Sequence, residues 1–144
     1  MSLDFEEVSV GHSVSTHSRT ITEADVANFA GVSGDFNPLH LSELFDEEGP
    51  FDERVVHGAL LFSICTGLLW QHRDERPETV AFYGVDNLRF VSPVTIGSTV
   101  HVEATLIEKE PTNHPEANGI ARYETELLAD GSVALTAELL SLIR

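Results

Sequence analysis

The apolar stretch from Gly58 to Trp70 constrains the fold of this chain more than any other feature. Ser63 and Thr66 interrupt it, and it is too short to cross a bilayer as a helix. A helix of this composition is apolar on nearly every face, which is typical of helices that other elements surround. The residues that produce the pattern are Ala59, Leu60, Leu61, Phe62, Ile64, Leu68, Leu69 and Trp70. The sequence therefore predicts a buried helix within Val55 to His72.

The second half of the chain has the character of β-strands. Thr79 to Val91 is rich in Val, Phe and Tyr, and Thr99 to Ile107 alternates between apolar and polar residues. Ile120 to Ala129 and Ser132 to Ile143 flank an Asp-Gly pair, a strong signal for a two-residue hairpin. The residues that should face the core from the alternating segment are Val100, Val102, Ala104 and Leu106. We therefore expect an α+β domain, residues 1–144, with an antiparallel sheet packed around one buried helix.

The first half contains shorter elements. Val14 to Ile21 has strand character, and Thr22 is a good cap for a helix that carries acidic residues in its first turn. We expect Gly31 to begin to end that helix. Leu41 to Phe45 should form a short helical turn, and Asp46 to Glu53 should form an exposed acidic loop.

The charge balance excludes some partners. The chain has 24 acidic residues against 8 basic ones, Lys109 is its only lysine, and the net charge is −16. Such a surface repels nucleic acid, so we expect no nucleic-acid partner. The acidic residues indicate either a strongly solvated surface or adaptation to a salt-rich cytoplasm, where salt screens their repulsion. We favour the second interpretation, which predicts that thermal stability rises with KCl.

Two further observations concern the cellular compartment and the role of the single cysteine. The sequence starts without a positively charged, apolar leader, so we expect a cytoplasmic protein with no membrane partner. The lone Cys65 lies inside the apolar stretch and has no second cysteine to pair with. We interpret it as a core residue and not as a nucleophile.

The segment from Ser33 to His40, with the sequence SGDFNPLH, carries the strongest chemical signal. Pro38 and the residue before it cannot stay helical, so the segment should form a stiff loop with Asp35 and His40 facing one space. A carboxylate and an imidazole together suit acid/base catalysis, because one can hold a water while the other moves a proton. Asp35 and Asn37 each also have a purely structural interpretation, as residues that hydrogen-bond to the backbone in turns.

A second imidazole, His57, directly precedes Gly58, which begins the predicted buried helix. The first N–H groups of a helix have no intrahelical partner and could stabilise an oxygen that gains negative charge. Alternatively, Gly58 only permits close packing, and His57 is a capping or core residue. The residues themselves leave these alternatives open.

Other chemistries find little support. His12 and His17 lie in or beside the first predicted strand, and no Cys–His cluster has metal-ligand spacing, so we expect no metal. The chain has no glycine-rich phosphate loop before a helix and no Gly-x-Ser-x-Gly run.

These motifs resemble those of the MaoC-like dehydratases, in particular the (R)-specific enoyl-CoA hydratases. The resemblance rests on SGDFNPLH at 33–40, VHG at 56–58, and LRFVSPV at 88–94 followed by Gly97. It implies a hot-dog fold, in which a long central helix is wrapped by a curved antiparallel sheet. It also implies a homodimer and the reversible syn addition of water to a trans-2-enoyl-CoA, which gives the (R)-3-hydroxyacyl-CoA. No cofactor is implied beyond the coenzyme A of the substrate.

The resemblance also implies roles for individual residues. Asp35 and His40 would hold and activate the water that attacks Cβ and would protonate Cα. The backbone N–H of Gly58 would donate to the thioester oxygen. Asn37 would fix the loop and orient His40, and His57 would support the site. A hydroxyl of Ser63 or Thr66 would bond to the catalytic carboxylate, although the family often has Ser where this chain has Thr66.

The acidic chain must still accept the negative charges of coenzyme A. Salt screening or nearby arginines would offset the repulsion. The candidate arginines are Arg54, Arg73, Arg76 and Arg89, with Arg89 favoured by its place in the motif. Two other functions stay open: a thioesterase of the same fold, and a non-catalytic acyl-CoA-binding subunit.

Overall fold

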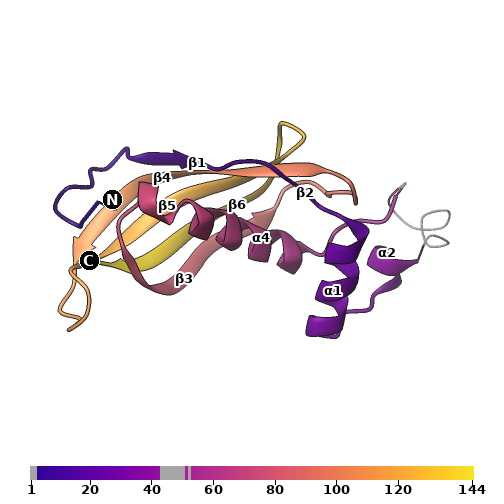
Figure 1. The fold of residues 1–144 in the computed structure, drawn as a ribbon, viewed down its shortest axis with the longest axis horizontal. Helices are drawn as coiled ribbons and strands as arrows, with labels where there is room; N and C mark the ends of the chain where they lie inside the picture. Colours follow the sequence, from indigo (N-terminus) through magenta and orange to yellow (C-terminus); the bar gives the residue numbers. More distant parts are fainter. Residues whose placement is uncertain (1–2, 43–50, 52) are drawn as a thin grey trace.

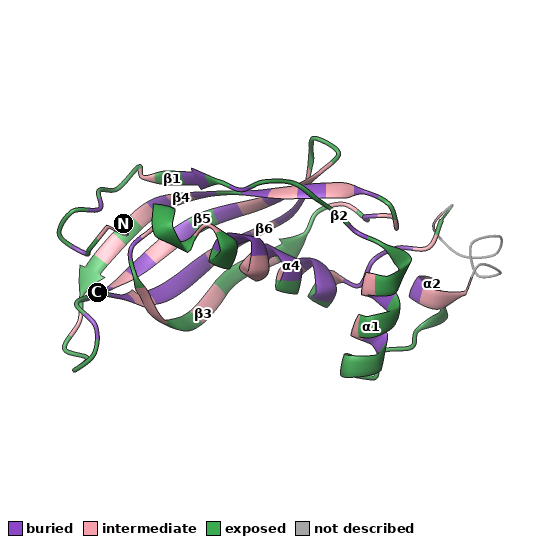
Figure 2. Cartoon of the chain, in the orientation of Figure 1, coloured by how far each residue is buried: buried purple, intermediate pink, exposed green. Residues whose placement is uncertain are grey.

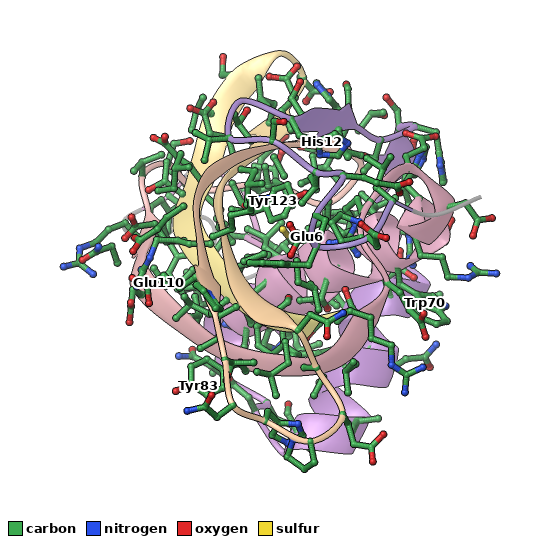
Figure 3. All side chains as sticks on the ribbon, turned by 90° about the vertical axis from the view of Figure 1, so that its left-hand side faces the viewer. Glu6, His12, Trp70, Tyr83, Glu110 and Tyr123 are labelled. Atoms are coloured by element: carbon green, nitrogen blue, oxygen red, sulfur yellow. The ribbon has the colours of Figure 1, made fainter. Side chains whose placement is uncertain are left out.

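The computed structural model of the chain describes residues 3–42, 51 and 53–144. Figure 1 shows a long antiparallel sheet with one helix, α4 (Gly58–Gln71), lying along it. Figure 3, which looks along the sheet from one end, shows the strands curving around the helix. Two shorter helices, α1 (Glu23–Ser33) and α2 (Pro38–Leu41), lie together beyond the beginning of α4. The predicted α+β architecture is therefore confirmed.

The sheet is built mainly from the second half of the chain, as the sequence predicted. The strands follow the order β1-β4-β5-β6-β3, and β2 also pairs with β4. All of these pairings are antiparallel. The bounds are β1 (Ser13–Ser15), β2 (Arg19–Thr20), β3 (Thr79–Phe90), β4 (Thr99–Pro111), β5 (Gly119–Ala129) and β6 (Ser132–Ile143). A short 3₁₀ helix, η1 (Arg73–Glu75), follows α4.

Two sequence patterns fixed this sheet. The four predicted core residues of β4, Val100 to Leu106 in steps of two, are all buried. Asp130 and Gly131 connect β5 to β6 with positive φ values of 49° and 86°, the backbone that a tight hairpin requires. Because Asp and Gly tolerate this conformation better than other residues, the hairpin was predictable from these two positions.

Helix α4 packs on the sheet but is not surrounded on every side. Its buried residues are Leu60, Leu61, Ile64, Cys65, Leu68 and Leu69. Ala59, Ser63 and Trp70 are exposed and lie on one face, because residues spaced by about 3.6 positions align on a helix. Figure 2 shows both the buried and the exposed faces of α4. The prediction of a helix buried on all sides is therefore corrected: within this chain the sheet covers only one side.

The first half of the chain departs from expectation in three places. The single strand predicted for Val14 to Ile21 is two short strands, β1 and β2. Gly31 lies inside α1, which ends at Gly34 in the left-handed conformation with φ 80°. The helical turn is α2, which begins at Pro38 because proline at the first helical position is already set to a helical φ. Residues 43–50 and 52, where we expected the rest of that turn and most of the acidic loop, lie outside the described residues.

None of the helices in the described part of the chain is long and apolar enough to cross a membrane. The core lies between α4 and the sheet. Its largest fully buried side chains include Ile21, Leu68, Leu106, Leu127 and Leu135. Cys65 is fully buried among them, and burial raises the pKa of its thiol to about 12. The thiolate is therefore scarce at neutral pH, which supports the core interpretation of this residue.

Candidate active site

The loop between α1 and α2 is held by a ladder of short-range hydrogen bonds. The Asp35 N–H donates to Ser33 Oγ at 3.1 Å, and the Asn37 N–H donates to Asp35 Oδ1 at 3.2 Å. The Leu39 N–H donates in turn to Asn37 Oδ1 at 3.0 Å, which makes Asn37 the cap of α2. The structural and functional interpretations of Asp35 and Asn37 are thus compatible, because the same turn bonds that shape the loop also aim its side chains.

His40 is buried and points its Nδ1 at a backbone carbonyl. Nδ1 lies 2.6 Å from the carbonyl oxygen of Val55, and only 7% of the residue is exposed. Because a carbonyl oxygen can only accept a hydrogen bond, Nδ1 carries the proton in the neutral ring. The other nitrogen, Nε2, therefore keeps a lone pair that can accept a proton.

His57 lies between the two catalytic candidates. Its Nε2 donates to the backbone oxygen of Asp35 at 3.0 Å. Its ring stacks on His40 with 3.8 Å between centroids and meets Phe29 edge-on at 5.0 Å. The residue is 2% exposed, and its Nδ1 has no hydrogen-bond partner among the described residues. His57 thus connects α1, the Asp35 loop and the start of α4.

Gly58 begins α4 beside this cluster, and no side chain caps the helix there. A cleft of about 330 Å³ is lined by His40, Gly58, Leu61, Phe90 and Val94, among others. A Cβ on Gly58 would lie 2.8 Å from Cζ of Phe90, so the glycine does permit close packing. This contact supports the packing interpretation of Gly58. Among the described residues no backbone carbonyl accepts a hydrogen bond from its N–H, so a chemical role for that group stays open as well.

The structure brings three metal-binding groups together that the sequence analysis did not combine. One ligand atom each from Asp35, His40 and His57 lies within 4.8 Å of the others, with Asp35 exposed and the histidines buried. The two histidines considered from the sequence lie elsewhere. His12 Nδ1 is 3.0 Å from the hydroxyl of Tyr123, and His17 Nδ1 is 2.9 Å from Nε2 of His72. The set of three could hold a divalent cation, because imidazole and carboxylate are suitable ligands.

The hydroxyls on α4 do not contact the catalytic carboxylate within this chain. Ser63 Oγ donates to the carbonyl of Ala59 and Thr66 Oγ1 to that of Ser63, each at 2.8 Å. Both residues line a second pocket farther along the helix. The expected bond to Asp35 is therefore not formed in the single chain, because a helical Ser or Thr readily bonds to its own preceding turn.

The candidate arginines occupy different environments. Arg54 forms an ion pair with Glu23 at 2.9 Å, so part of its charge is offset. Arg89 is exposed on β3 and donates to the carbonyl of Leu88 at 2.8 Å. Among the described residues it has no carboxylate within salt-bridge distance. Arg73 lies over the ring of Trp70 at 4.7 Å, and Arg76 is partly buried.

Sequence reasoning missed three contributors to the site. The carbonyl of Val55 sets the tautomer of His40, Phe29 packs on His57, and Phe90 packs on Gly58. Phe90 lies in the LRFVSPV segment, so its motif was a usable signal. No sequence signal could have revealed the role of the Val55 carbonyl, because a backbone oxygen can come from any residue type.

Comparisons with known proteins identify the family of this chain. The sequence profile described as "MaoC like domain" matches residues 5–127. The chain is 45% identical over 105 residues to Protein MaoC of Klebsiella aerogenes, covering 73% of this chain but 31% of that protein. It thus spans about a third of the length of that relative. It is 37% identical over 122 residues to the (R)-specific enoyl-CoA hydratase of Aeromonas caviae, covering 84% and 85% of the two chains.

The structure of the monoamine oxidase regulatory protein from Archaeoglobus fulgidus superposes with a TM-score of 0.91 and 32% identity. The match covers 99% of this chain and 95% of that one. The curved sheet around α4 is therefore the hot-dog arrangement that the sequence motifs implied.

Proposed function

The chain belongs to the MaoC-like domain family, and on that premise we propose that it catalyses the reversible addition of water to a trans-2-enoyl-CoA. The product would be the (R)-3-hydroxyacyl-CoA, and the reverse reaction would be its dehydration. The observation that carries the proposal is the joint placement of the Asp35 carboxylate, His40 and the start of α4. His40 and Gly58 line one cleft, and the Asp35 carboxylate lies beside the His40 ring, so a base, a water-holding group and an oxyanion donor are close together.

The tautomer of His40 suggests how the proton moves. His40 Nε2 takes a proton from the water while the water oxygen attacks Cβ of the enoyl group. The Asp35 carboxylate accepts a hydrogen bond from the remaining hydrogen of that water and stabilises the imidazolium that forms. The protonated ring then returns its proton to Cα on the same face, so that one water is added in the syn sense.

The thioester oxygen gains negative charge between these two proton transfers. The N–H of Gly58, in the first turn of α4, would donate to that oxygen. The positive end of the helix dipole adds to the stabilisation, because it favours negative charge at this point. The ring of Phe90, which lies beside Gly58 in the same cleft, would keep water away from the same atoms.

Charge on the coenzyme A needs its own partner. Arg89 supports this role because it is exposed and has no described carboxylate partner. Reversal of its charge in Arg89→Glu should raise the KM for crotonyl-CoA. Inhibition by a free-acid analogue without the coenzyme should be unchanged, and an unchanged KM would discard the role. No cofactor enters any step of the proposed reaction.

We also propose that two copies of the chain pair through β3. This strand lies at one edge of the sheet, with β6 as its single neighbour in the strand order. Its exposed apolar side chains are Phe82, Tyr83 and Phe90, and Val91 follows directly. An exposed apolar edge strand is a template for pairing with another strand. A second copy offers the same surface, which suits the two-fold contact of a homodimer.

The test is loss of the enoyl-thioester absorbance with crotonyl-CoA in molar KCl, for the wild type and Asp35→Asn side by side. An (R)-specific coupling enzyme reports the stereochemistry of the product. Loss in the wild type alone, with (R) product, supports the hydratase. No loss with crotonyl-CoA or with longer and branched enoyl-CoAs, in a folded protein, rejects it and favours an acyl-CoA-binding subunit.

A thiol reagent distinguishes the thioesterase alternative in the same samples. Thioester hydrolysis releases free coenzyme A, whereas hydration leaves the thioester intact. Because Cys65 is buried and its thiol has a pKa of about 12, the native protein should contribute no background signal. A rise in free thiol with turnover would replace the hydratase with the thioesterase.

A further inference from the structure

Two histidines that the proposed reaction does not use lie against each other at the end of α4. His17 lies between β1 and β2, and His72 directly follows the last residue of α4. Nδ1 of His17 is 2.9 Å from Nε2 of His72, and the two ring centroids are 5.1 Å apart. Because 55 positions separate the two residues, no ligand spacing along the chain could reveal this pair.

The hydrogen bonds of His72 determine which of its nitrogens carries a lone pair. The backbone N–H of His17 donates to Nε2 of His72 at 3.1 Å, and an N–H can only donate. Nε2 is therefore unprotonated, and Nδ1 carries the proton of the neutral ring. Nδ1 in turn donates to Oε1 of Glu75 at 3.1 Å. A carboxylate that accepts from the far nitrogen orients an imidazole and makes it a better metal ligand.

The distance between the two facing nitrogens suits two ligands of one metal ion. Imidazole nitrogens lie about 2.0–2.1 Å from a bound transition metal, so two of them at a right angle are about 2.9 Å apart. The nitrogens of His17 and His72 have this separation. The same distance also fits a hydrogen bond from Nδ1–H of His17. A bound ion would replace that hydrogen, and His17 would then carry its proton on Nε2.

Both histidines belong to backbone that other hydrogen bonds hold in place. The carbonyl of His72 accepts from the N–H of Glu75 at 3.1 Å. Next to His17, Thr16 exchanges two hydrogen bonds of 2.9 Å with the backbone of Val102 on β4, one through its N–H and one through its hydroxyl. The two nitrogens are therefore already close together, and little further ordering would oppose the binding of an ion.

The pair is accessible to ions in solution. His17 is exposed, and the side chain of His72 is 17% exposed. The chain has a net charge of −16, which raises the concentration of cations near its surface. The adjacent basic residue, Arg73, places its guanidinium over the ring of Trp70, 4.7 Å from the centroid. A cation can therefore approach the two imidazoles.

We propose that His17 and His72 bind one divalent transition-metal ion, with Glu75 as the carboxylate that orients His72. Two imidazole ligands at a right angle favour Ni²⁺ or Cu²⁺, which accept square or tetragonal arrangements that water completes. The bound ion joins the link between β1 and β2 to the end of α4. This site is separate from the three groups at the start of α4, and it does not depend on the proposed reaction.

The test is calorimetric titration of Ni²⁺ into the wild type, His17→Ala, Glu75→Gln and His101→Ala. His101 is the matched control, because it lies 3.3 Å from a carboxylate oxygen of Glu103 but contacts no second imidazole in the described part of the chain. We expect His17→Ala to weaken the binding of one ion per chain about tenfold or more. Glu75→Gln should weaken it about tenfold, the usual effect of losing such a carboxylate. His101→Ala should bind like the wild type.

A second ion could bind to Asp35, His40 and His57, so the two events must be separated. Each protein is therefore also prepared with Asp35→Asn, which removes one ligand of that set. In this background Ni²⁺ should raise the Tm of the otherwise wild-type chain and of His101→Ala, because it binds the folded state. It should leave the Tm of His17→Ala unchanged. Unfolding without Ni²⁺ shows that each variant is folded.

The proposal is overturned if the wild type and His17→Ala bind the same number of ions with the same affinity. It is also overturned if His101→Ala loses as much affinity as His17→Ala, because Ni²⁺ would then bind exposed histidines in general. A third result also rejects it: His17→Ala lowers the Tm without Ni²⁺, and the ion changes the Tm of neither protein. The two histidines would then form only a hydrogen-bonded contact.

Discussion

His57 stacks on His40 with 3.8 Å between the ring centroids, and its Nε2 lies 3.0 Å from the backbone oxygen of Asp35. One buried ring thus fixes the positions of both proposed catalytic groups. It touches the backbone of the first and the side chain of the second. We therefore propose that His57 positions them, because its own Nε2 is occupied by the Asp35 carbonyl.

Replacing His57 by Leu should lower kcat and leave the KM largely unchanged. The variant loses the hydrogen bond to Asp35, so the carboxylate samples other positions. We expect a fall of about tenfold or more in kcat, since a hydrogen bond contributes about 1 kcal/mol and misplacement adds to the loss. Steady-state kinetics with crotonyl-CoA measure the change in kcat and in KM. His57→Gln, which keeps a donor, should recover part of the activity, and an unchanged kcat in folded His57→Leu would refute the positioning role.

Removal of the backbone donor at Gly58 should abolish most of the activity without unfolding the helix. Proline is well tolerated at the first position of a helix, and His57 has ψ 134°, which suits a residue before proline. Gly58→Pro should therefore lower kcat by about 100-fold relative to Gly58→Ala, on the scale of a lost oxyanion donor. Gly58→Ala is the control. Both variants add a Cβ that approaches the ring of Phe90, but only proline lacks the backbone N–H.

The stability of the two Gly58 variants separates packing from chemistry. The atoms that a new Cβ would meet belong to the ring of Phe90, which is 51% exposed and has room to shift. Both variants should therefore unfold within a few degrees of the wild type in thermal denaturation. Equal kcat values for the alanine and proline variants would show that Gly58 acts only through packing.

The activity should survive removal of metal ions. Asp35, His40 and His57 could hold a divalent cation, but in the proposed reaction the same groups hold a water and move a proton. We therefore expect EDTA to leave kcat unchanged and added Zn²⁺ to inhibit, because zinc would occupy the place of the water. His17 and His72 form a separate pair, so Zn²⁺ inhibition should persist in His17→Ala. Loss of activity on chelation, restored by metal, would overturn the metal-free reaction.

The sequence predicted those features of the fold that depend on neighbouring residues in the chain. The alternation of β4, the Asp-Gly hairpin and the capping residue Thr22 each act through neighbours in the chain, and each was predicted. The end of α1 was misplaced because a glycine inside a helix costs only about 1 kcal/mol, and packing of Val26 and Ala30 outweighs it. Arg76 and Tyr123 line one pocket although 47 positions separate them in the chain, and no local pattern encodes such a pairing.

In the candidate site, too, the features that depend on neighbouring residues were predictable and those that depend on the packing of distant segments were not. SGDFNPLH predicted that Asp35 and His40 lie on one stiff loop and face one space. The structure brings the two side chains together, but only Asp35 lies on the loop, because Pro38 begins the short helix α2 that carries His40. The contact of Phe29 with His57 depends on how α1 packs against the start of α4, so it appeared only in the structure. Thr66 illustrates the opposite error, since a motif match suggested a contact with Asp35 that this chain alone does not form.

A charge on β3 should prevent pairing of two copies. Tyr83 is 59% exposed on this edge strand, and a glutamate there would place like charges opposite each other in a two-fold contact. We expect Tyr83→Glu to run as a monomer and the wild type as a dimer in light scattering coupled to size exclusion. Val32→Glu is the control, because Val32 is 87% exposed on α1, away from the strand. A monomeric wild type would contradict the proposed pairing.

Asp25 should stabilise the fold only while it is ionised. It completes the capping box of α1 with Thr22 and lies 2.8 Å from Arg19. Burial acts to raise the pKa of Asp25, but the hydrogen bonds from Thr22 and the charge of Arg19 outweigh it, so the pKa lies below its ordinary value. A lowered folded-state pKa means that the contribution is complete above the unfolded pKa of about 3.9 and is lost as pH falls through the folded value.

The measurement is urea unfolding of the wild type and Asp25→Asn at pH 7 and at pH 3. At pH 7 the variant should be less stable by about 1 kcal/mol, the usual contribution of a helix cap. The difference should be smaller at pH 3, which lies below the unfolded pKa of about 3.9, because protonation of the unfolded chain there begins to remove the contribution of the ionised carboxylate. Glu6→Gln removes the same charge from an exposed residue outside α1 and should change stability little at either pH. A difference for Asp25→Asn that is equal at both pH values would show that its charge makes no contribution.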